Sequence, residues 1–189
     1  MSSPRTFIID PIIISEHEKT IEPVHFLVFN LFSLSVKEQS YRNPVPTVDS
    51  IIQRDSQILL VRRKKEPFKD HLVLPGGFVN EGERVEDAAK REVKEETSLD
   101  IEVTDILGVY SEPKRDPRGH ITSTVFIGKI LLSNNKIDAK AQDDAAAIEW
   151  IDIEQADSVK FGFDHKKIIS DYKKWKQIRG TFWSSKNEF

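Results

Sequence analysis

Residues 77–99 read GFVNEGERVEDAAKREVKEETSL, and the second half of this stretch has the pattern of an amphipathic helix. Small apolar residues recur there every three or four positions and so share one helix face: Val85, Ala88, Ala89, Val93. Glu86 and Asp87 would lie in the first turn, where the helix dipole favours acids. The pattern predicts a helix over residues 85–97.

Three carboxylates crowd the other end of this predicted helix. Glu92, Glu95 and Glu96 stand at positions i, i+3 and i+4, so their side chains share one narrow arc. Like charges at that spacing repel by roughly 0.2–0.5 kcal/mol, and the last turn of a helix favours cations. A hard divalent cation, Mg²⁺ or Mn²⁺, would compensate them. A solvated acidic face is the alternative, because Arg91 is spaced to pair with Glu95.

The turn before the helix favours the metal-site interpretation. A predicted strand ends in Pro75-Gly76-Gly77, so that two glycine carbonyls come close to the acid-rich helix. Glycine lets the backbone approach a ligand closely and take unusual dihedral angles. The sequence therefore groups backbone carbonyls and carboxylates, which are the oxygen donors that hard cations prefer.

The spacing of these residues resembles the Nudix box, G-x5-E-x7-R-E-U-x-E-E-x-G-U, in which U is aliphatic. Residues 77–99 match every fixed position except one, since Ser98 stands where the family has glycine. The box covers only these residues, while the wider likeness in fold covers about residues 44–178. The resemblance implies the Nudix fold and a Mg²⁺-dependent hydrolase that splits a pyrophosphate linkage in a nucleotide derivative.

The resemblance also implies a role for each polar residue of the box. Arg91 would orient the carboxylates, and Glu83 would pair with Arg91 or lie just outside the metal ligands. Glu95 would bind metal or help to take a proton from water, and which glutamate is the general base stays open. The implied catalytic residues are Glu83, Arg91, Glu92, Glu95, Glu96. The implied metal ligands are Gly76, through its carbonyl, with Glu92, Glu95, Glu96.

Ser98 changes the expected end of the helix. Glycine often takes a left-handed conformation just after a helix, and a residue with a side chain costs about 1–2 kcal/mol there. We therefore expect the cap geometry to depart from the family pattern. The catalysis is expected to be kept, because Ser98 replaces no ligand.

The flanking sequence predicts strands on both sides of the first helix and a second helix near the end. Runs of β-branched and apolar residues predict strands over residues 47–53, 57–63, 71–74, 101–110, 121–132 and 145–151. The second helix starts at Phe163-Asp164, with Asp164 as its N-cap, and has one apolar face: Ile168, Ile169, Tyr172, Trp175. Most strand connections are too short for parallel crossovers. We therefore expect an α+β fold, with a mixed or largely antiparallel sheet sandwiched between helices (α/β/α).

Residues 1–43 are predicted to form an N-terminal β extension to a Nudix domain over residues 44–189. Segments 7–14 and 24–36 are rich in β-branched and aromatic residues, which predicts two strands. The two strands could form a hairpin or add to a partner's sheet. We therefore expect a homodimer.

Basic residues concentrate in the loop over residues 110–120, between two predicted strands. Arginine suits bidentate phosphate contacts, although an ordinary solvated hairpin loop is the alternative. The candidate substrate-binding residues are Arg62, Lys114, Arg115, Arg118, His120. An acidic residue outside the box often completes the metal site in Nudix enzymes, and the candidates are Glu112, Asp143, Asp144.

Three segments resemble the ADP-ribose pyrophosphatase branch of the family, namely residues 41–49, 110–120 and 163–165. They imply hydrolysis of ADP-ribose to AMP and ribose 5-phosphate. Another nucleotide substrate stays open, such as a nucleotide sugar, a dinucleoside polyphosphate, NADH or a damaged nucleoside triphosphate. A non-catalytic ADP-ribose-sensing regulator also stays open. Such regulators carry an added DNA-binding domain, whereas about 30 residues follow the last predicted strand and loop here, fewer than the roughly 50 of a usual domain.

The bulk composition excludes several classes of protein. The 189 residues carry a net charge of −3. The chain therefore lacks the excess of basic residues that is typical of a long nucleic-acid-binding surface. The chain has no cysteine, which excludes disulfides, zinc–thiolate sites and cysteine nucleophiles. No signal-peptide pattern opens the sequence, and the longest apolar run, residues 24–36, is shorter than the ~20 residues that span a membrane. We expect a cytoplasmic protein with a nucleoside diphosphate small-molecule substrate and no nucleic-acid or membrane partner.

Overall fold

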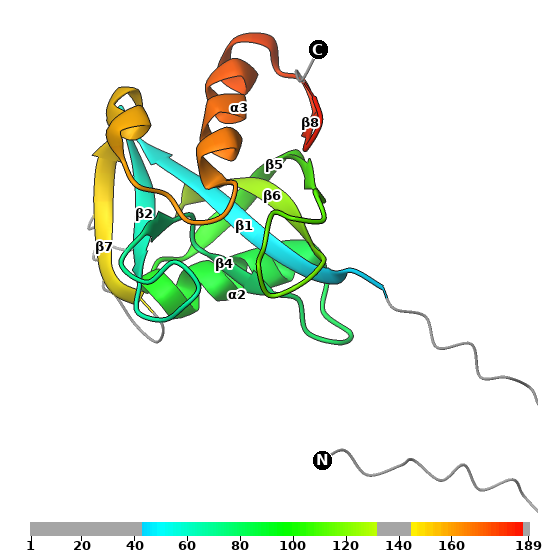
Figure 1. Ribbon diagram of the computed structural model, residues 1–189. Coiled ribbons are helices and arrows are strands. Elements are labelled where there is room, and N and C mark those ends of the chain that lie inside the picture. The colour runs from blue at the N-terminus through cyan, green and yellow to red at the C-terminus, as the bar shows by residue number, and fades with distance from the viewer. Residues whose placement is uncertain (1–42, 132–144, 187–189) are drawn as a thin grey trace, which may run out of the picture. The chain divides into compact units, whose positions relative to one another are not determined.

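A mixed β-sheet forms the centre of the computed structural model, which describes residues 43–131 and 145–186 (Figure 1). The strands are β1 (Val45–Arg54), β2 (Gln57–Arg63), β3 (Leu72–Val73), β4 (Gly76–Phe78), β5 (Ile101–Tyr110), β6 (Ile121–Ile130), β7 (Ala145–Asp152) and β8 (Phe182–Trp183). The helical elements are α2 (Val85–Thr97), the short 3₁₀ helix η1 (Ile153–Ser158) and α3 (His165–Ile178).

β1 is the strand around which the sheet is organised. It pairs in parallel with β6, from Val45 opposite Ile121 to Ile52 opposite Gly128, and antiparallel with β2 and β4. β2 in turn pairs antiparallel with β3 and β7, and β6 pairs antiparallel with β5. The expectation of a mixed, largely antiparallel sheet is confirmed.

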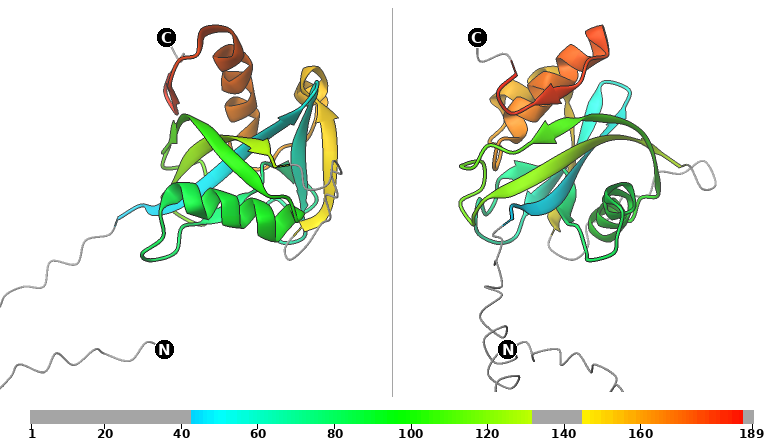
Figure 2. Two further views of the ribbon diagram at one scale, coloured as in Figure 1. Left: turned by 180° about the vertical axis from the view of Figure 1, so that it is seen from behind. Right: turned by 90° about the vertical axis from the view of Figure 1, so that its right-hand side faces the viewer.

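α2 and α3 lie on opposite faces of the sheet (Figures 1 and 2). The predicted apolar face of α2 packs inward, because Ala88 and Ala89 share a buried cluster with Val48 and Phe126. Val93 joins a neighbouring cluster one turn later. Small side chains let the helix approach the sheet closely, which brings the carboxylates of Glu92 and Glu96 to the start of β4. The predicted helix over residues 85–97 and the α/β/α arrangement are confirmed.

α3 covers the other face with the apolar residues that its spacing predicted, and these join the main core cluster: Ile168, Ile169, Tyr172, Trp175. Asp164 occupies the N-cap position, as predicted, although its side chain makes no capping hydrogen bond. Both carboxylate oxygens instead accept N–H groups of Arg115, from the loop between β5 and β6. This ion pair fixes the start of α3 against that loop.

The predicted strands lie within two residues of their expected ends, but β4 and β8 were not predicted. β8 pairs in parallel with β5, Gly108 opposite Phe182 and Val109 opposite Trp183. A Cβ at position 108 would lie 1.9 Å from the Phe182 carbonyl oxygen, so this close approach requires glycine. Phe182 is buried in the main core, whereas Trp183 is half exposed. Strands of two or three residues are too short to show a hydrophobic period.

Two predictions cannot be compared with the structure. The β extension over residues 1–43 lies outside the described residues up to residue 42, and the loop that carries Asp143 and Asp144 lies outside them as well. Among the residues that the structure does describe, no helix is both long enough and apolar enough to cross a membrane.

Ser98 keeps the left-handed conformation that the family assigns to glycine, with φ 63° and ψ 5°, so the expected departure in cap geometry is wrong. Its N–H donates to the Lys94 carbonyl at 2.9 Å and closes the last turn of α2. Because glycine takes this conformation without steric cost, Ser98→Gly is expected to raise the free energy of unfolding by about 1 kcal/mol. Urea denaturation measures it.

Ser98→Ala is the matched control for that substitution. Alanine keeps the backbone strain and removes only the hydroxyl, so its stability is expected to stay within about 0.5 kcal/mol of the natural chain. Equal stabilisation by both substitutions would contradict the assignment to backbone strain.

Candidate active site

A cavity of about 510 Å³ is lined by residues of the sheet, its loops and both helical layers. Its lining comes from β1, β2 and the residues after it, the turn through β4, the C-terminal half of α2, the β5–β6 loop and the start of α3. The ionisable residues that line it are Asp49, Arg63, Lys64, Lys65, Glu92, Glu95, Glu96, Arg115, Asp116, Arg118, His165. Acidic and basic side chains therefore share one cavity. Such a cavity suits a metal cation, held by the acidic side chains, together with an anionic substrate, held by the basic ones.

Arg91 organises the acidic residues of α2. Its Nε and Nη2 donate to the two carboxylate oxygens of Glu83 at 2.7 and 2.9 Å. Its Nη1 donates to Glu92 at 2.6 Å and to Glu95 at 3.1 Å. Nη2 also donates to the Phe78 carbonyl, which ties the helix to the turn before it. The hydrogen bonds from Arg91 hold the pKa of Glu83 at about 2.

Glu96 is a half-buried carboxylate of the site. Its Oε2 accepts the Gly76 N–H at 3.1 Å, and burial raises its pKa to about 8. Burial also raises the pKa of Glu92, whose carboxylate lies against the turn. A Cβ at position 77 would come within 2.4 Å of the Glu92 carboxyl carbon. Any larger residue at this first position of the box would therefore clash with the Glu92 carboxylate, which is why the position requires glycine. Both glutamates thus lie where a cation would favour their ionised forms.

The residues present fit a divalent cation by their chemistry. Glu92 and Glu96 offer carboxylate oxygens, and Gly76 lines the same cavity with its backbone. Within residues 43–131 and 145–186, no three acidic or histidine side chains already converge as a metal cluster. Arg91 holds the carboxylates of Glu92 and Glu95 instead. A cation would therefore compete with Arg91 for these oxygens.

The raised pKa of Glu96 predicts how the metal-free protein responds to pH. The folded protein binds this proton more tightly than the unfolded chain, so the stability that Glu96 contributes is fully present below about pH 4.5 and is lost as the pH rises through about 8. Glu96→Gln removes the titration. Both proteins are measured in the presence of a chelator. The free energy of unfolding of Glu96→Gln minus that of the natural chain should rise with pH between 4.5 and 8, by at most roughly 1.4 kcal/mol per pH unit. Urea denaturation at a series of pH values measures this, and a constant difference would contradict it.

Asp49 and His165 line the cavity, although no sequence pattern assigned a site role to Asp49 and His165 was expected only at the start of a helix. Asp49 Oδ2 accepts the Ser123 hydroxyl at 2.5 Å, and its Oδ1 lies 3.4 Å from His165 Nε2. Burial lowers the pKa of His165. The run Val48 to Ile52 contains one acid, Asp49, beside a single other polar residue, and this acid is the signal that could have pointed to the site, since a charge is rarely buried unless it is paired.

Arg115 and Arg118 are the two predicted substrate-binding residues that line the cavity. Arg115 is 4% exposed, and its guanidinium is occupied by a bidentate pair with Asp164 at 2.9 and 2.6 Å. Arg118 is 40% exposed and pairs with Asp116. Its guanidinium lies 5.2 Å from the ring of Phe78 and 5.4 Å from that of Phe163. Arg118 is therefore the better placed of the two to meet a ligand.

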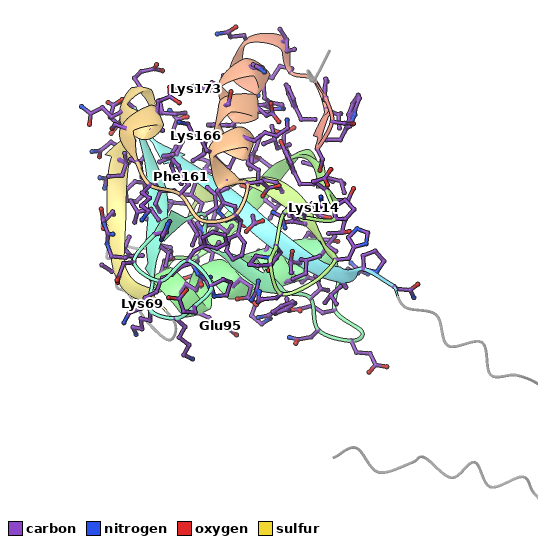
Figure 3. The ribbon with its side chains drawn as sticks, in the orientation of Figure 1. Lys69, Glu95, Lys114, Phe161, Lys166 and Lys173 are labelled. Carbon is purple, nitrogen blue, oxygen red and sulfur yellow. The ribbon has the colours of Figure 1, made fainter. Side chains whose placement is uncertain are left out.

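The other predicted substrate residues do not line the cavity. Arg62 donates to Glu149 on β7 and to the Asp70 carbonyl, while its neighbour Arg63 lines the cavity. Lys114 lies on the β5–β6 loop, well apart from Glu95 on α2 (Figure 3), and His120 contacts the Ser111 carbonyl. Glu112, proposed as an outside metal ligand, is exposed and also lies off the cavity. Successive residues of a strand point to opposite faces, which separates Arg62 from Arg63.

Known proteins share both the sequence and the fold. The family model of the NUDIX domain matches residues 43–172. An ADP-ribose pyrophosphatase of Methanocaldococcus jannaschii is 49% identical over 140 residues, which are 74% of this chain and 79% of that protein. The ADPR responsive transcriptional repressor NtrR of Acinetobacter baylyi is 30% identical over 152 residues, which are 77% of this chain and 60% of the repressor.

A solved structure agrees with these sequence matches. A bifunctional NMN adenylyltransferase/ADP ribose pyrophosphatase from Francisella tularensis, complexed with AMP and a Mn ion, superposes with a TM-score of 0.60 at 26% identity, covering 80% of this chain and 45% of that one. The family model spans well over half of the chain, and its match includes the whole box on α2. The chain therefore belongs to the Nudix family of hydrolases.

Proposed function

We propose that this protein hydrolyses ADP-ribose to AMP and ribose 5-phosphate in a reaction that depends on Mg²⁺. The observation that carries the proposal is the half-buried Glu96 carboxylate, which accepts the Gly76 N–H in the same cavity as Glu92 and several basic side chains. The choice of substrate is supported by the 49% identity to an ADP-ribose pyrophosphatase.

The acidic wall would supply the metal site. Nudix hydrolases generally use a divalent metal ion, and here Glu92, Glu96 and the Gly76 carbonyl would hold it. Bound Mg²⁺ would neutralise charge on the pyrophosphate and lower the pKa of a coordinated water. Glu95 lies at the exposed rim of the cavity, where it would help to take a proton from the attacking water. Arg91 would hold the carboxylates in place between turnovers.

The basic wall would bind the substrate. Arg118 would contact the phosphates or stack on the adenine, because its exposed guanidinium lies within 5.4 Å of two aromatic rings of the cavity. Arg63, Lys64 and Lys65 come from the opposite side, at the end of β2, and add positive charge. Arg115 would act indirectly, since Asp164 already occupies its guanidinium.

A panel of substrates tests the proposed reaction. The protein is incubated with MgCl₂ and, separately, ADP-ribose, a nucleotide sugar, a dinucleoside polyphosphate, NADH or 8-oxo-dGTP, and the products are separated by ion-exchange chromatography. We expect the highest kcat/KM for ADP-ribose, with AMP and ribose 5-phosphate formed in equal amounts. Faster cleavage of another member of the panel would contradict ADP-ribose as the substrate but would still support pyrophosphate hydrolysis.

An ADP-ribose-binding regulator is the second candidate, because the NtrR repressor is 30% identical over most of this chain. The intact carboxylates of the box favour the enzyme. A gel-shift assay with genomic DNA fragments distinguishes them, since the enzyme is expected to shift none of the fragments at any ADP-ribose concentration.

Three finer expectations belong to the same proposal. We expect Mg²⁺ to be the working ion, with Mn²⁺ able to replace it, and a metal titration of the activity tests this. We expect a homodimer, which size-exclusion chromatography with light scattering tests. We expect a cytoplasmic location, which fractionation of the source cells tests.

A further inference from the structure

Leu74 and Pro75 lead the chain from the sheet into the turn that lines the active site. Just before them, the Leu72 N–H donates to the Lys160 carbonyl, and the Leu72 carbonyl accepts the Gly162 N–H. Just after them, Gly76 starts the pairing of β4 with β1. Leu74 and Pro75 lie between these two sets of backbone hydrogen bonds, and proline has no N–H to donate. The Leu74 N–H is buried and therefore needs a hydrogen-bond acceptor.

The imidazole of His165 supplies that acceptor. Its Nδ1 accepts the Leu74 N–H at 2.8 Å, and the side chain is 3% exposed. A ring nitrogen that accepts carries no proton, so the proton of the neutral imidazole lies on Nε2. Nε2 lies 3.4 Å from Oδ1 of Asp49. One ring at the start of α3 thus contacts both the turn and the strand that pairs with it.

Asp49 continues this chain of contacts toward the metal site. Asp49 and Gly76 are direct partners in the β1–β4 ladder, and a Cβ at position 76 would lie 2.8 Å from Oδ1 of Asp49. The Gly76 N–H in turn donates to Glu96. His165, Leu74, Asp49, Gly76 and Glu96 therefore form one contiguous set of contacts from α3 to α2.

We propose that His165 is a positioning residue for the Nudix reaction, because its ring fixes the turn so that Gly76 keeps its place against Glu96. The inference rests on the metal site of the proposed function and is independent of which substrate is cleaved. A histidine that merely filled space beside the Phe163 ring, 5.5 Å away, would affect stability without affecting the metal site.

Three substitutions of His165 separate its two contacts. His165→Asn places an amide oxygen near the position of Nδ1 and so keeps an acceptor for the Leu74 N–H. His165→Gln reaches toward Asp49 with an amide nitrogen but leaves Leu74 without its acceptor, and His165→Ala removes both contacts. Ile168→Val is the matched control, because it removes one methyl group from the same buried face of α3 and costs about 0.5–1.5 kcal/mol.

The main readout is the dissociation constant for Mn²⁺ without substrate, measured by electron paramagnetic resonance of the free ion, together with kcat and KM for ADP-ribose. Groups that orient metal ligands typically change metal affinity by about 10–100-fold. We expect His165→Ala to weaken Mn²⁺ binding about tenfold or more and to lower kcat with little change in KM. His165→Asn is expected to bind Mn²⁺ with a dissociation constant within about threefold of that of the natural chain. His165→Gln is expected to resemble His165→Ala, and Ile168→Val is expected to resemble the natural chain.

Each other outcome has a separate meaning. Natural Mn²⁺ affinity and kcat in His165→Ala, or an equal loss in Ile168→Val, would overturn the positioning role. A natural chain that binds Mn²⁺ but leaves ADP-ribose intact would refute the proposed substrate alone, and the Mn²⁺ measurements would still decide the role of His165. A natural chain that binds no Mn²⁺ would overturn the metal site and the inference together.

Discussion

Glu96→Gln is expected to lower kcat by about 10³-fold while the fold is kept. The substitution removes a carboxylate from the proposed metal site, and loss of one such stabilising group commonly costs about 10²–10³ in rate, to which weaker metal binding adds. Glutamine retains an oxygen that can accept the Gly76 N–H, so the turn before α2 keeps its contact. Initial rates of AMP release at increasing MgCl₂ concentrations measure the effect.

Asp87→Asn is the matched control on the same helix. Asp87 lies in the first turn of α2, is exposed and pairs with Lys90 at 3.6 Å, so its loss is expected to change kcat by less than twofold. If Glu96→Gln kept more than a tenth of the natural kcat at saturating MgCl₂, the proposed role of Glu96 would be wrong.

Arg115→Ala is expected to lower the free energy of unfolding by about 3–5 kcal/mol. The guanidinium is almost fully buried, makes a bidentate pair with Asp164 and lies 3.6 Å from Asp49. Removing one partner from a buried ion pair leaves the other charges without compensation, which produces a loss of that size. Urea denaturation followed by circular dichroism measures the free energy of unfolding.

Two further variants test the explanation of that loss. Lys114→Ala changes an exposed basic residue of the same loop and is expected to alter stability by less than about 0.5 kcal/mol. Adding Asp164→Asn to Arg115→Ala removes one uncompensated charge and should recover part of the stability. A loss below about 1 kcal/mol for Arg115→Ala would show that the buried pair contributes little.

The sequence predicted the parts of the fold that repeat over short distances. The apolar spacing of α2 and α3 gave both helices, with the bounds of α2 at residues 85–97, because a helix buries one face along its whole length. The carboxylates of the box were predicted together for the same reason, since one helix turn brings Glu92 and Glu96 to the same side. The observed sheet topology and the family match confirm the α+β arrangement.

Contacts between distant segments could not be predicted in this way. Leu74 and His165 are separated by 91 positions, and no local period connects them. Arg62 and Arg63 show the same difficulty within a strand, because neighbouring residues of a strand point to opposite faces of the sheet. The sequence alone did not show which of the two faces lines the cavity. Arg115 was predicted from its charge, but the structure uses that charge to hold Asp164.

β8 has a consequence for the durability of the purified protein. Phe182 leaves the core if the chain is cut by a protease near Ile178, which is 65% exposed, and the backbone of β5 beside Gly108 then loses its partner strand. Uncovered strand edges pair readily with other molecules. The two residues of β8 thus protect part of the β5 edge from pairing with other molecules and so from aggregation.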